Sequence, residues 1–266
     1  MRVGDWMTQD VPAVDPATSA VECRQRMRDG SVRCLPVVDD GALVGRVTDV
    51  AAFGRHPAGA TVADLISPAP LIVLVDEPLA DVLARCAWSM QDTVFVVDRG
   101  QLVGVLTEHD AVRHAASELP VQLRVRDWAN ASPTTIDADV TVQDALQQMK
   151  RWFVRHLVVL DGGRLVRVLS LRDVLIDQVD GSLSPDDRRV RRVRDLTPQA
   201  AVWTTQWNVP LRQAAQEMVE HGVGCLPVVA DDDPQRVQGV ITRSDLVRAM
   251  VDCVLREDPC VVGVQP

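Results

Sequence analysis

Apolar residues recur with helical spacing in three segments of the chain. They fall at i, i+3, i+4, i+7 and i+8 in residues 79–87 and 211–219, and at i, i+3, i+4 and i+7 in residues 142–149. This spacing places one apolar stripe on a helix. We therefore predict three amphipathic helices whose stripes pack on a sheet of the same protein rather than in a partner's groove. Asp76, Asp139 and Asn208 lie three residues before the three stripes, where we expect the N-caps.

Short apolar runs predict buried strands that lead into hairpins. After three of the runs come residue pairs that tolerate positive φ, which indicates tight hairpin turns. The runs are 35–38, 94–97, 157–160 and 226–229, and the turns are Asp40-Gly41, Arg99-Gly100 and Gly162-Gly163.

The second strand of each hairpin runs into a seven-residue pattern, which we call the heptad. Its full form, Gly-x-x-Thr-x-x-Asp, occupies residues 104–110 and 239–245. Residues 167–173 begin with Arg167 instead of glycine and carry Ser170 as the hydroxyl, and residues 45–51 end with Ala51 instead of aspartate. Four copies at matched distances from other landmarks indicate an internal repeat.

A second landmark, which we call the preamble, precedes each heptad. It reads Val-x-Asp followed by Trp or Leu, and begins at Val3, Val62, Val125 and Val193. From its Asp to the first heptad residue the spacing is 40 residues for Asp5–Gly45, Asp64–Gly104 and Asp127–Arg167, and 44 for Asp195–Gly239. The longer spacing places a small insertion around residues 231–234.

These landmarks predict four α/β repeats, each ordered strand–helix–strand–strand–helix. We expect repeat 1 at 1–58, repeat 2 at 59–119, repeat 3 at 120–181, and a linker plus repeat 4 at 182–266. A repeat of about 60 residues has a small core and exposes one face of its sheet, so it needs a neighbour. Residues 1–119 and 120–266 would form two pairs.

Composition narrows the classes of function. The chain has 266 residues, and its hydrophobic content of 47% is typical of a globular protein. Its net charge of -9 counts against general nucleic-acid binding. Five arginines in residues 188–194 could contact nucleic acid, but no aromatic residue is interleaved, and we expect a linker helix paired with nearby aspartates. No apolar run reaches the roughly 18 residues of a membrane-spanning helix, and no signal peptide opens the chain.

Six cysteines and five histidines show no metal-ligand spacing. We expect free thiols, no metal and a cytoplasmic protein, with Cys34 and Cys225 as buried strand residues. We find no nucleophile–His–Asp set, no P-loop and no GxGxxG after a strand, so the sequence does not indicate an enzyme.

Nearly the whole chain resembles CBS (cystathionine beta-synthase) domains. The matching features are the preambles, the Leu-Pro-Val-Val strands, the Asp-Gly turn and the heptads. The resemblance implies four β-α-β-β-α units in two tandem pairs, known as Bateman modules. The four units resemble the arrangement in the gamma subunit of AMP-activated protein kinase, where four such units form a flat pseudo-symmetric disc.

The resemblance implies that paired units bind AMP, ADP, ATP or S-adenosylmethionine as a regulatory ligand, with no cofactor required. An ionised carboxylate accepts two O–H donors from a vicinal diol, and a hydroxyl at a strand-to-helix junction lies where helix amides favour phosphate. The implied ribose-binding carboxylates are Asp110, Asp173 and Asp245, and the implied hydroxyls are Thr48, Thr107, Ser170 and Thr242. Candidate phosphate-binding residues are Arg33, Arg155, His156, Arg172 and Arg243. Repeat 1 keeps Thr48 but has Ala51 where the carboxylate would be. In repeat 3, Arg167 replaces the heptad glycine, so we do not expect the backbone there to be approached as closely.

We therefore expect a non-enzymatic sensor that changes the relation of paired units when an adenosine-containing ligand binds. It would act on another protein in trans or on a second copy in a homodimer, with no membrane and no nucleic acid as partner. The alternative is a scaffold or oligomerisation module whose ligand sites have decayed, which would be indifferent to nucleotides.

Overall fold

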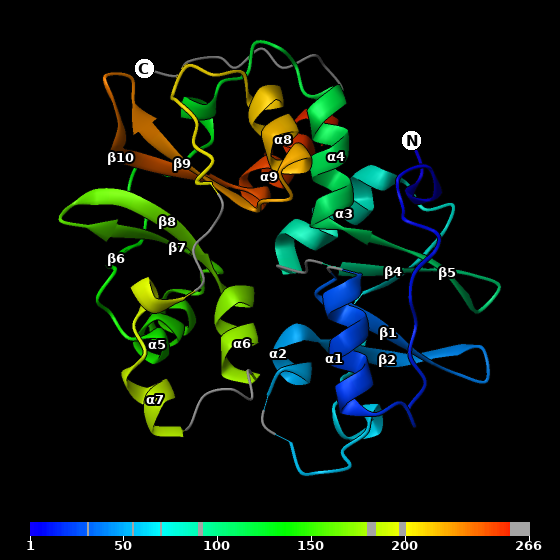
Figure 1. The fold of residues 1–266 in the computed structure, drawn as a ribbon. Helices are drawn as coiled ribbons and strands as arrows, with labels where there is room; N and C mark the ends of the chain where they lie inside the picture. Colours follow the sequence, from blue (N-terminus) through cyan, green and yellow to red (C-terminus); the bar gives the residue numbers. More distant parts are fainter. Residues whose placement is uncertain are drawn as a thin grey trace. The chain divides into compact units, whose positions relative to one another are not determined.

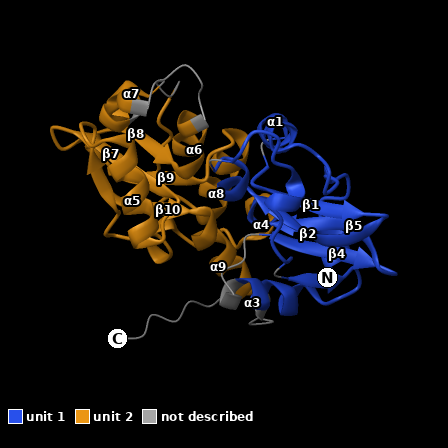
Figure 2. Ribbon diagram, turned by 90° about the horizontal axis from the view of Figure 1, so that it is seen from below, with its two compact units in different colours: residues 1–111 blue, residues 112–266 orange. Residues whose placement is uncertain are grey.

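The computed structural model describes residues 1–30, 32–54, 56–69, 71–89, 93–179, 185–196 and 201–255. Residues 180–184 of the expected linker, and Cys260, lie outside this part of the chain. The protein divides into two compact units, Met1–Ala111 and Val112–Pro266 (Figure 2). Each is described by itself, and the disc expected of four units stays a prediction.

The first compact unit is built around a five-stranded mixed sheet with strand order β1-β2-β5-β4-β3 (Figure 1). Ala42 of β2 pairs with Gln101 of β5, so the hairpins of repeats 1 and 2 join in one sheet. Its strands are β1 (Cys34–Asp39), β2 (Ala42–Thr48), β3 (Ile72–Leu74), β4 (Thr93–Asp98) and β5 (Gln101–Thr107). Its helices are α1 (Ala20–Asp29), α2 (Asp49–Ala52) and α3 (Leu79–Ser89), with 3-10 turns η1 (Val3–Asp5) and η2 (Val62–Asp64). Helix α4 (Glu108–Glu118) continues into the second compact unit.

The second compact unit holds a three-stranded sheet, ordered β6-β7-β8, and the two-stranded β10-β9 hairpin. Its strands are β6 (Thr135–Asp137), β7 (His156–Asp161), β8 (Arg164–Ser170), β9 (Cys225–Ala230) and β10 (Asp233–Thr242). Its helices are α5 (Val142–Trp152), α6 (Leu171–Val179), α7 (Pro185–Val190), α8 (Leu211–Glu220) and α9 (Arg243–Leu255), with 3-10 turns η3 (Val125–Asp127) and η4 (Val193–Asp195). The predicted α/β class with four repeats is confirmed.

The three predicted hairpin turns are present. Asp40 and Gly41 have φ of 46° and 82°, and Arg99 and Gly100 have φ of 48° and 81°. Two successive positive φ values match the right-handed twist of the flanking strands, which is why these turns connect them tightly. The third turn, Gly162-Gly163, has φ of 57° and 80°.

The opening strand of the repeat is shorter in repeats 1 and 4 than in repeats 2 and 3. There it is a single parallel bridge, Val14 to Val37 or Thr205 to Val228, whereas β3 and β6 are three-residue strands. In repeat 2 the backbone N–H of Phe95 donates to the Leu71 carbonyl. The corresponding residues in repeats 1 and 4 are Pro36 and Pro227, and proline has no N–H to extend the ladder.

The predicted N-caps are wrong by two residues. Helix α5 begins after Thr141, whose side chain accepts a hydrogen bond from the Asp144 N–H, while Asp139 forms ion pairs with Arg192 and Arg194. Helix α8 begins after Pro210 rather than after Asn208. The apolar stripes themselves are confirmed.

The stripe of α5 shows how a helix packs on the sheet of its own repeat. Val142, Ala145 and Met149 are buried in one cluster with strand residues of β7 and β8. Val193 and Leu196, which belong to the preamble of repeat 4, are buried in the same cluster. The core of repeat 3 is therefore completed by a segment that the sequence places in the next repeat.

Within each pair, the preamble of each repeat hydrogen-bonds to the other repeat. In the first compact unit Gly4 of η1 donates to the Val75 carbonyl of repeat 2 over 2.9 Å, and Val62 of η2 donates to Thr18 of repeat 1 over 2.8 Å. In the second compact unit the same exchange joins Val125 to Val209 and Val193 to Val140, over 3.0 and 2.9 Å. Each repeat therefore depends on its partner for part of its packing, as its small size predicts.

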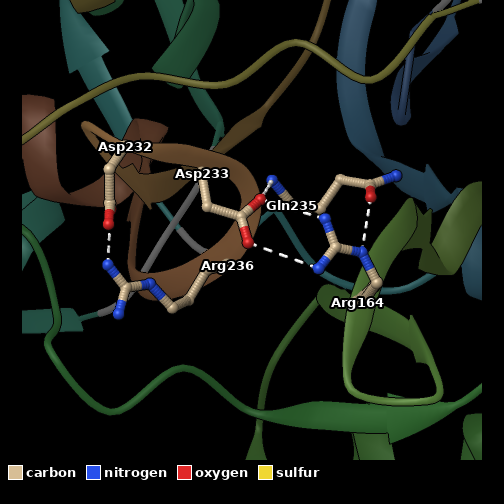
Figure 3. A network of polar contacts seen from close by, with 5 residues as sticks. All are labelled: Arg164, Asp232, Asp233, Gln235 and Arg236. Atoms are coloured by element: carbon tan, nitrogen blue, oxygen red, sulfur yellow. Dashed lines mark hydrogen bonds and ion pairs between the residues drawn. The ribbon is translucent and has the colours of Figure 1, made fainter.

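The insertion in repeat 4 contacts the hairpin of repeat 3 (Figure 3). Arg164, directly after the Gly162-Gly163 turn, donates to both carboxylate oxygens of Asp233 and, over 2.6 Å, to Gln235 Oε1. The Gln235 N–H also donates to Asp233 Oδ1 over 3.0 Å. In this pair of repeats side chains join the hairpins where the backbone pair Ala42–Gln101 joins them in the first pair.

Candidate functional site

The hydroxyl and the carboxylate of the heptad meet at the first turn of the helix that follows it. Asp110 Oδ2 accepts from both the N–H and the Oγ1–H of Thr107, over 2.9 and 2.6 Å, and the Asp110 N–H donates back to Thr107 Oγ1 over 3.3 Å. Ser170 and Asp173 repeat this arrangement with distances of 2.8, 2.7 and 3.2 Å. These contacts form a reciprocal helix cap. The pair thus caps the helix in repeats 2 and 3 through Oδ2, and the second carboxylate oxygen, Oδ1, takes no part in the cap.

The second oxygen, Oδ1, has a different environment in each repeat. Asp110 is 2% exposed and its Oδ1 accepts a 2.7 Å hydrogen bond from Thr8 Oγ1. Asp245, whose Oδ2 is capped by Thr242 over 2.7 Å, is 6% exposed and has an ion pair between Oδ1 and Arg248. Asp173 is half-buried. Among the described residues no hydrogen-bond donor reaches its Oδ1.

Repeat 1 has half of this arrangement. Thr48 is the N-cap of α2 and its Oγ1 accepts from the Ala51 N–H over 3.2 Å, but Ala51 offers no carboxylate in return. Asp49, which is buried, turns its Oδ1 to the Val50 N–H instead. The first heptad therefore retains the cap and lacks an acceptor for a diol.

The first heptad residue decides how closely a crossing segment approaches. A Cβ added to Gly45 would lie 2.7 Å from Ser67 O, and one added to Gly104 would lie 2.7 Å from Thr8 O. A Cβ added to Gly239 would lie 2.9 Å from Asn130 O. Isolated β-bridges Thr8–Val105, Arg46–Ser67 and Asn130–Val240 occur at these three contacts.

Arg167 stands at this position in repeat 3. Its side chain is buried and its guanidinium lies 3.4 and 3.5 Å from the carbonyl oxygens of Val193 and Leu196. Leu196 is extended, with φ -68° and ψ 147°, whereas Trp6 and Leu65 at the same place are helical. Burial lowers the pKa of Arg167, and the charge of Asp173 opposes that shift.

The five basic candidates separate into three groups. Arg33 Nη1 lies 3.9 Å from Glu108 Oε2, so this side chain of repeat 1 reaches the first residue of α4. Arg243 is directed to its own repeat, because its Nη2 donates to the Val223 carbonyl over 3.2 Å.

The third group gathers at the start of α6. The Leu171 N–H donates to the Arg155 carbonyl over 2.8 Å, His156 pairs with Ser170 across the β7–β8 hairpin, and Arg172 follows Leu171 in the helix. The backbone positions of three of the basic candidates therefore lie beside the Ser170–Asp173 cap.

Two residues that contact the carboxylates were missed in the sequence. Thr8 and Arg248 lie outside every heptad. A signal for Thr8 exists, because the fifth residue after the first valine of the preamble is polar in three repeats, namely Thr8, Ser67 and Asn130. Arg248 follows Asp245 by one helical turn, a spacing that brings side chains together on a helix.

Three arginines of the arginine-rich run pair with aspartates, as expected, although they follow the linker helix α7, which ends at Val190. Arg191 Nε lies 2.7 Å from Asp177 Oδ1, and Asp139 pairs with Arg192 and Arg194 over 2.9 and 2.7 Å. Within the described ranges no group of three potential metal-ligating side chains forms, and no helix is long and apolar enough to cross a bilayer.

The described cysteines are free thiols. Cys225 is buried as expected, whereas Cys34 is only half-buried. Burial raises the pKa of the Cys86 thiol to about 11 and also raises those of Cys23 and Cys225. Buried thiols of this kind are poor nucleophiles.

Comparison with known proteins identifies the class to which this architecture belongs. The family model of the CBS domain matches residues 3–51, 62–117, 125–179 and 208–252. The chain therefore belongs to the CBS domain family, whose paired domains are in general regulatory, ligand-binding modules.

Individual relatives are similar to different extents. MJ1225 of Methanocaldococcus jannaschii is 23% identical over 270 residues, which cover 90% of this chain and 94% of that protein. Its crystal structure, that of a proposed archaeal homologue of g-AMPK, has a TM-score of 0.80 at 19% identity and covers 94% of this chain and 100% of the other. This likeness shows the fold.

Two further relatives cover only part of this chain. The glycine betaine/carnitine/choline transport ATP-binding protein OpuCA of Bacillus subtilis is 24% identical over 182 residues, 63% of this chain, and the chain spans 45% of the length of OpuCA. CBSX2, a CBS-pair protein of Arabidopsis thaliana, has been solved in complex with AMP. That complex is 33% identical and covers 43% of this chain and 95% of its own, with a TM-score of 0.39.

Proposed function

We propose that this protein is a non-enzymatic sensor that binds an adenosine-containing ligand, of the AMP, ADP, ATP or S-adenosylmethionine class, beside a heptad carboxylate. The observation that carries this proposal is the state of Asp173. Its Oδ2 is held by Ser170, its side chain is half-buried, and no described donor occupies Oδ1. A fixed carboxylate with an available oxygen is suited to accept both hydroxyls of a ribose.

The surroundings of Asp173 supply the positive charge that a phosphorylated ligand needs. Three basic residues have their backbone positions at the start of α6, namely Arg155, His156 and Arg172. The first turn of a helix also presents backbone N–H groups and the positive end of the helix dipole. We therefore assign the ribose to Asp173 and the phosphate to this basic group.

Transmission of ligand binding would follow from the exchanged preambles. The η4 turn of repeat 4 hydrogen-bonds to repeat 3 through Val193 and Arg194, and the guanidinium of Arg167, the first heptad residue of repeat 3, donates to the Val193 carbonyl. A ligand that favours one arrangement of these parts shifts the population of the pair. The regulated partner would be another protein or a second copy of this chain.

The test is thermal unfolding of the purified protein with adenosine, AMP, ADP, ATP, S-adenosylmethionine and cyclic di-AMP, with GTP as the control. A ligand at about 100 times its Kd adds roughly 2.7 kcal/mol, which raises Tm by several degrees. We expect a shift with one adenine compound that GTP does not reproduce and that Asp173→Ala removes. A shift that survives Asp173→Ala would contradict the assignment of the ribose.

A second candidate function is a scaffold whose ligand sites have decayed. Ala51 lacks the carboxylate, and the carboxylates of Asp110 and Asp245 are buried and already bonded to Thr8 and Arg248. This candidate predicts no shift of Tm with any nucleotide.

A further inference from the structure

Thr8 joins two repeats at the carboxylate of a heptad. The η1 preamble carries it from repeat 1 onto β5 of repeat 2, where its N–H donates to the Val105 carbonyl over 2.8 Å and its carbonyl accepts from Val105 over 2.9 Å. This backbone pairing is close enough to require glycine at position 104. The pairing leaves Thr8 Oγ1 at 2.7 Å from Asp110 Oδ1.

The hydrogen bonds of the two carboxylates differ in number. An ionised carboxylate offers about four lone-pair positions, and a vicinal diol needs two of them. Thr107 occupies two positions on Asp110 and Thr8 a third. Ser170 occupies two on Asp173, and within the described residues nothing occupies a third. A diol can therefore add to Asp173 but must displace Thr8 from Asp110.

The residue at the start of the heptad explains this difference. Glycine at 104 admits the segment that carries Thr8, whereas Arg167 fills the corresponding space in repeat 3 and bonds to the carbonyls of Val193 and Leu196. Leu196 is extended instead of helical. Arg167 thus bonds to the preamble of repeat 4, whereas Gly104 admits the preamble segment that carries Thr8.

We propose that Thr8 is a latch that closes the Asp110 site, so that the Asp173 site binds a nucleotide first and the Asp110 site binds only when the Thr8 hydroxyl withdraws. The proposal rests on the proposed function and adds an order of occupancy to it. Thr8 is a positioning residue of this site. Its hydroxyl competes with a ribose hydroxyl for the same oxygen.

The test is isothermal titration of the full chain with AMP, which carries both a diol and a phosphate. In the parent protein we expect one tight event, removed by Asp173→Ala. In Thr8→Val, which nearly preserves the shape of the side chain, Asp110 Oδ1 loses the Thr8 hydroxyl and a ribose hydroxyl can take its place. Binding at Asp110 should then tighten at least about tenfold and appear as a second event, since the ligand no longer has to break a hydrogen bond worth on the order of 1–3 kcal/mol to a charged group.

Three variants control this result. Thr8→Ser keeps the hydroxyl and should behave as the parent, and adding Asp110→Asn to Thr8→Val should remove the second event. Thr8→Ala repeats the test without the β-branch, and circular dichroism checks that each variant is folded.

The outcomes separate the two proposals. AMP binding that depends on Asp173 but is the same in the parent, Thr8→Val and Thr8→Ala would overturn the latch and leave the proposed function standing. Weaker binding in Thr8→Val and Thr8→Ala would also overturn the latch, because Thr8 would then assist the ligand. No binding of AMP by any of the proteins would overturn the AMP-binding function and the latch with it.

Discussion

Gly104 lies so close to Thr8 that a Cβ added to the glycine would be 2.7 Å from the Thr8 carbonyl oxygen and 2.7 Å from Met7 Sδ. Real Cβ atoms do not approach a backbone oxygen so closely. Packing between paired repeats therefore requires the heptad glycine. Repeat 3 has Arg167 in its place, and the arginine side chain bonds to the preamble of repeat 4.

Gly104→Ala should lower the free energy of unfolding by roughly 1–3 kcal/mol, because the added methyl group must push the Thr8 backbone away. Urea unfolding followed by circular dichroism measures the change. Gly30→Ala is the control, since Gly30 ends α1 with an ordinary φ of -77° and should tolerate a methyl group with a smaller effect. Equal stability of Gly104→Ala and the parent would show that the crossing segment is not held closely.

The ion pair between Asp177 and Arg191 should contribute to stability more than the other ion pairs of the arginine-rich run. The Asp177 side chain is 7% exposed and Arg191 Nε lies 2.7 Å from it. Removing Asp177 leaves the partly buried guanidinium of Arg191, 23% exposed, without this carboxylate, so Asp177→Ala should cost about 1–3 kcal/mol.

Asp139→Ala is the matched change at an exposed pair, because the side chains of Asp139 and Arg192 are 50% and 52% exposed. It should cost less than about 1 kcal/mol. Similar losses in the two variants, measured by urea unfolding, would mean that burial does not distinguish these pairs.

Arg155→Ala should weaken AMP more than it weakens adenosine, if Arg155 faces the phosphate of a ligand held by Asp173. A charge-assisted hydrogen bond contributes about 1.5–3 kcal/mol, so the loss for AMP should be about tenfold or more. Calorimetric Kd values for the two ligands provide the comparison. Equal losses for AMP and adenosine would count against a contact with the phosphate.

Cys86 and Cys225 should resist alkylation in the folded protein. Burial raises the pKa of Cys86 to about 11, and a thiol reacts as the thiolate, so at pH 8 only about 0.1% of Cys86 is reactive. Cys34 and Cys253 are half-buried and should react with iodoacetamide first. Peptide mass spectrometry identifies the labelled sites, and the same experiment in urea should label all of them at similar rates.

Asp233 should titrate below the ordinary range of an aspartate. Its pKa is lowered first by the Gln235 backbone N–H and then by the Arg164 guanidinium. Because the folded-state pKa is the lower one, any stabilisation from this network is present above the unfolded pKa and is lost as pH falls through the folded pKa.

An NMR titration of the Asp233 carboxyl carbon measures this pKa directly. Arg164→Met should raise it only in part, because the Gln235 N–H remains. Arg126→Met is the control, since Arg126 lies on η3 and pairs with Asp127. A pKa of Asp233 that is unchanged by Arg164→Met would remove the guanidinium as a cause.

Periodicity in the sequence was enough to predict the repeats, the hairpin turns and the stripes of the helices. These features depend on local backbone preferences and on the alternation of apolar and polar residues, so each can be recognised within a short window. The N-caps were predicted less well, because Thr141 is nearer to its helix than Asp139. The opening strands of repeats 1 and 4 are limited to one bridge each, because Pro36 and Pro227 lack the N–H that a longer strand requires.

The heptads and preambles were therefore determined by the sequence alone, as were the hydroxyls and carboxylates they carry. Only the tertiary structure decided that each preamble packs on the partner repeat, that Thr8 reaches Asp110, and that Arg167 bonds to the preamble of repeat 4. The reason is physical. A hydrogen bond between residues about a hundred positions apart depends on which backbone segments can approach each other, and the presence or absence of one Cβ decides that approach.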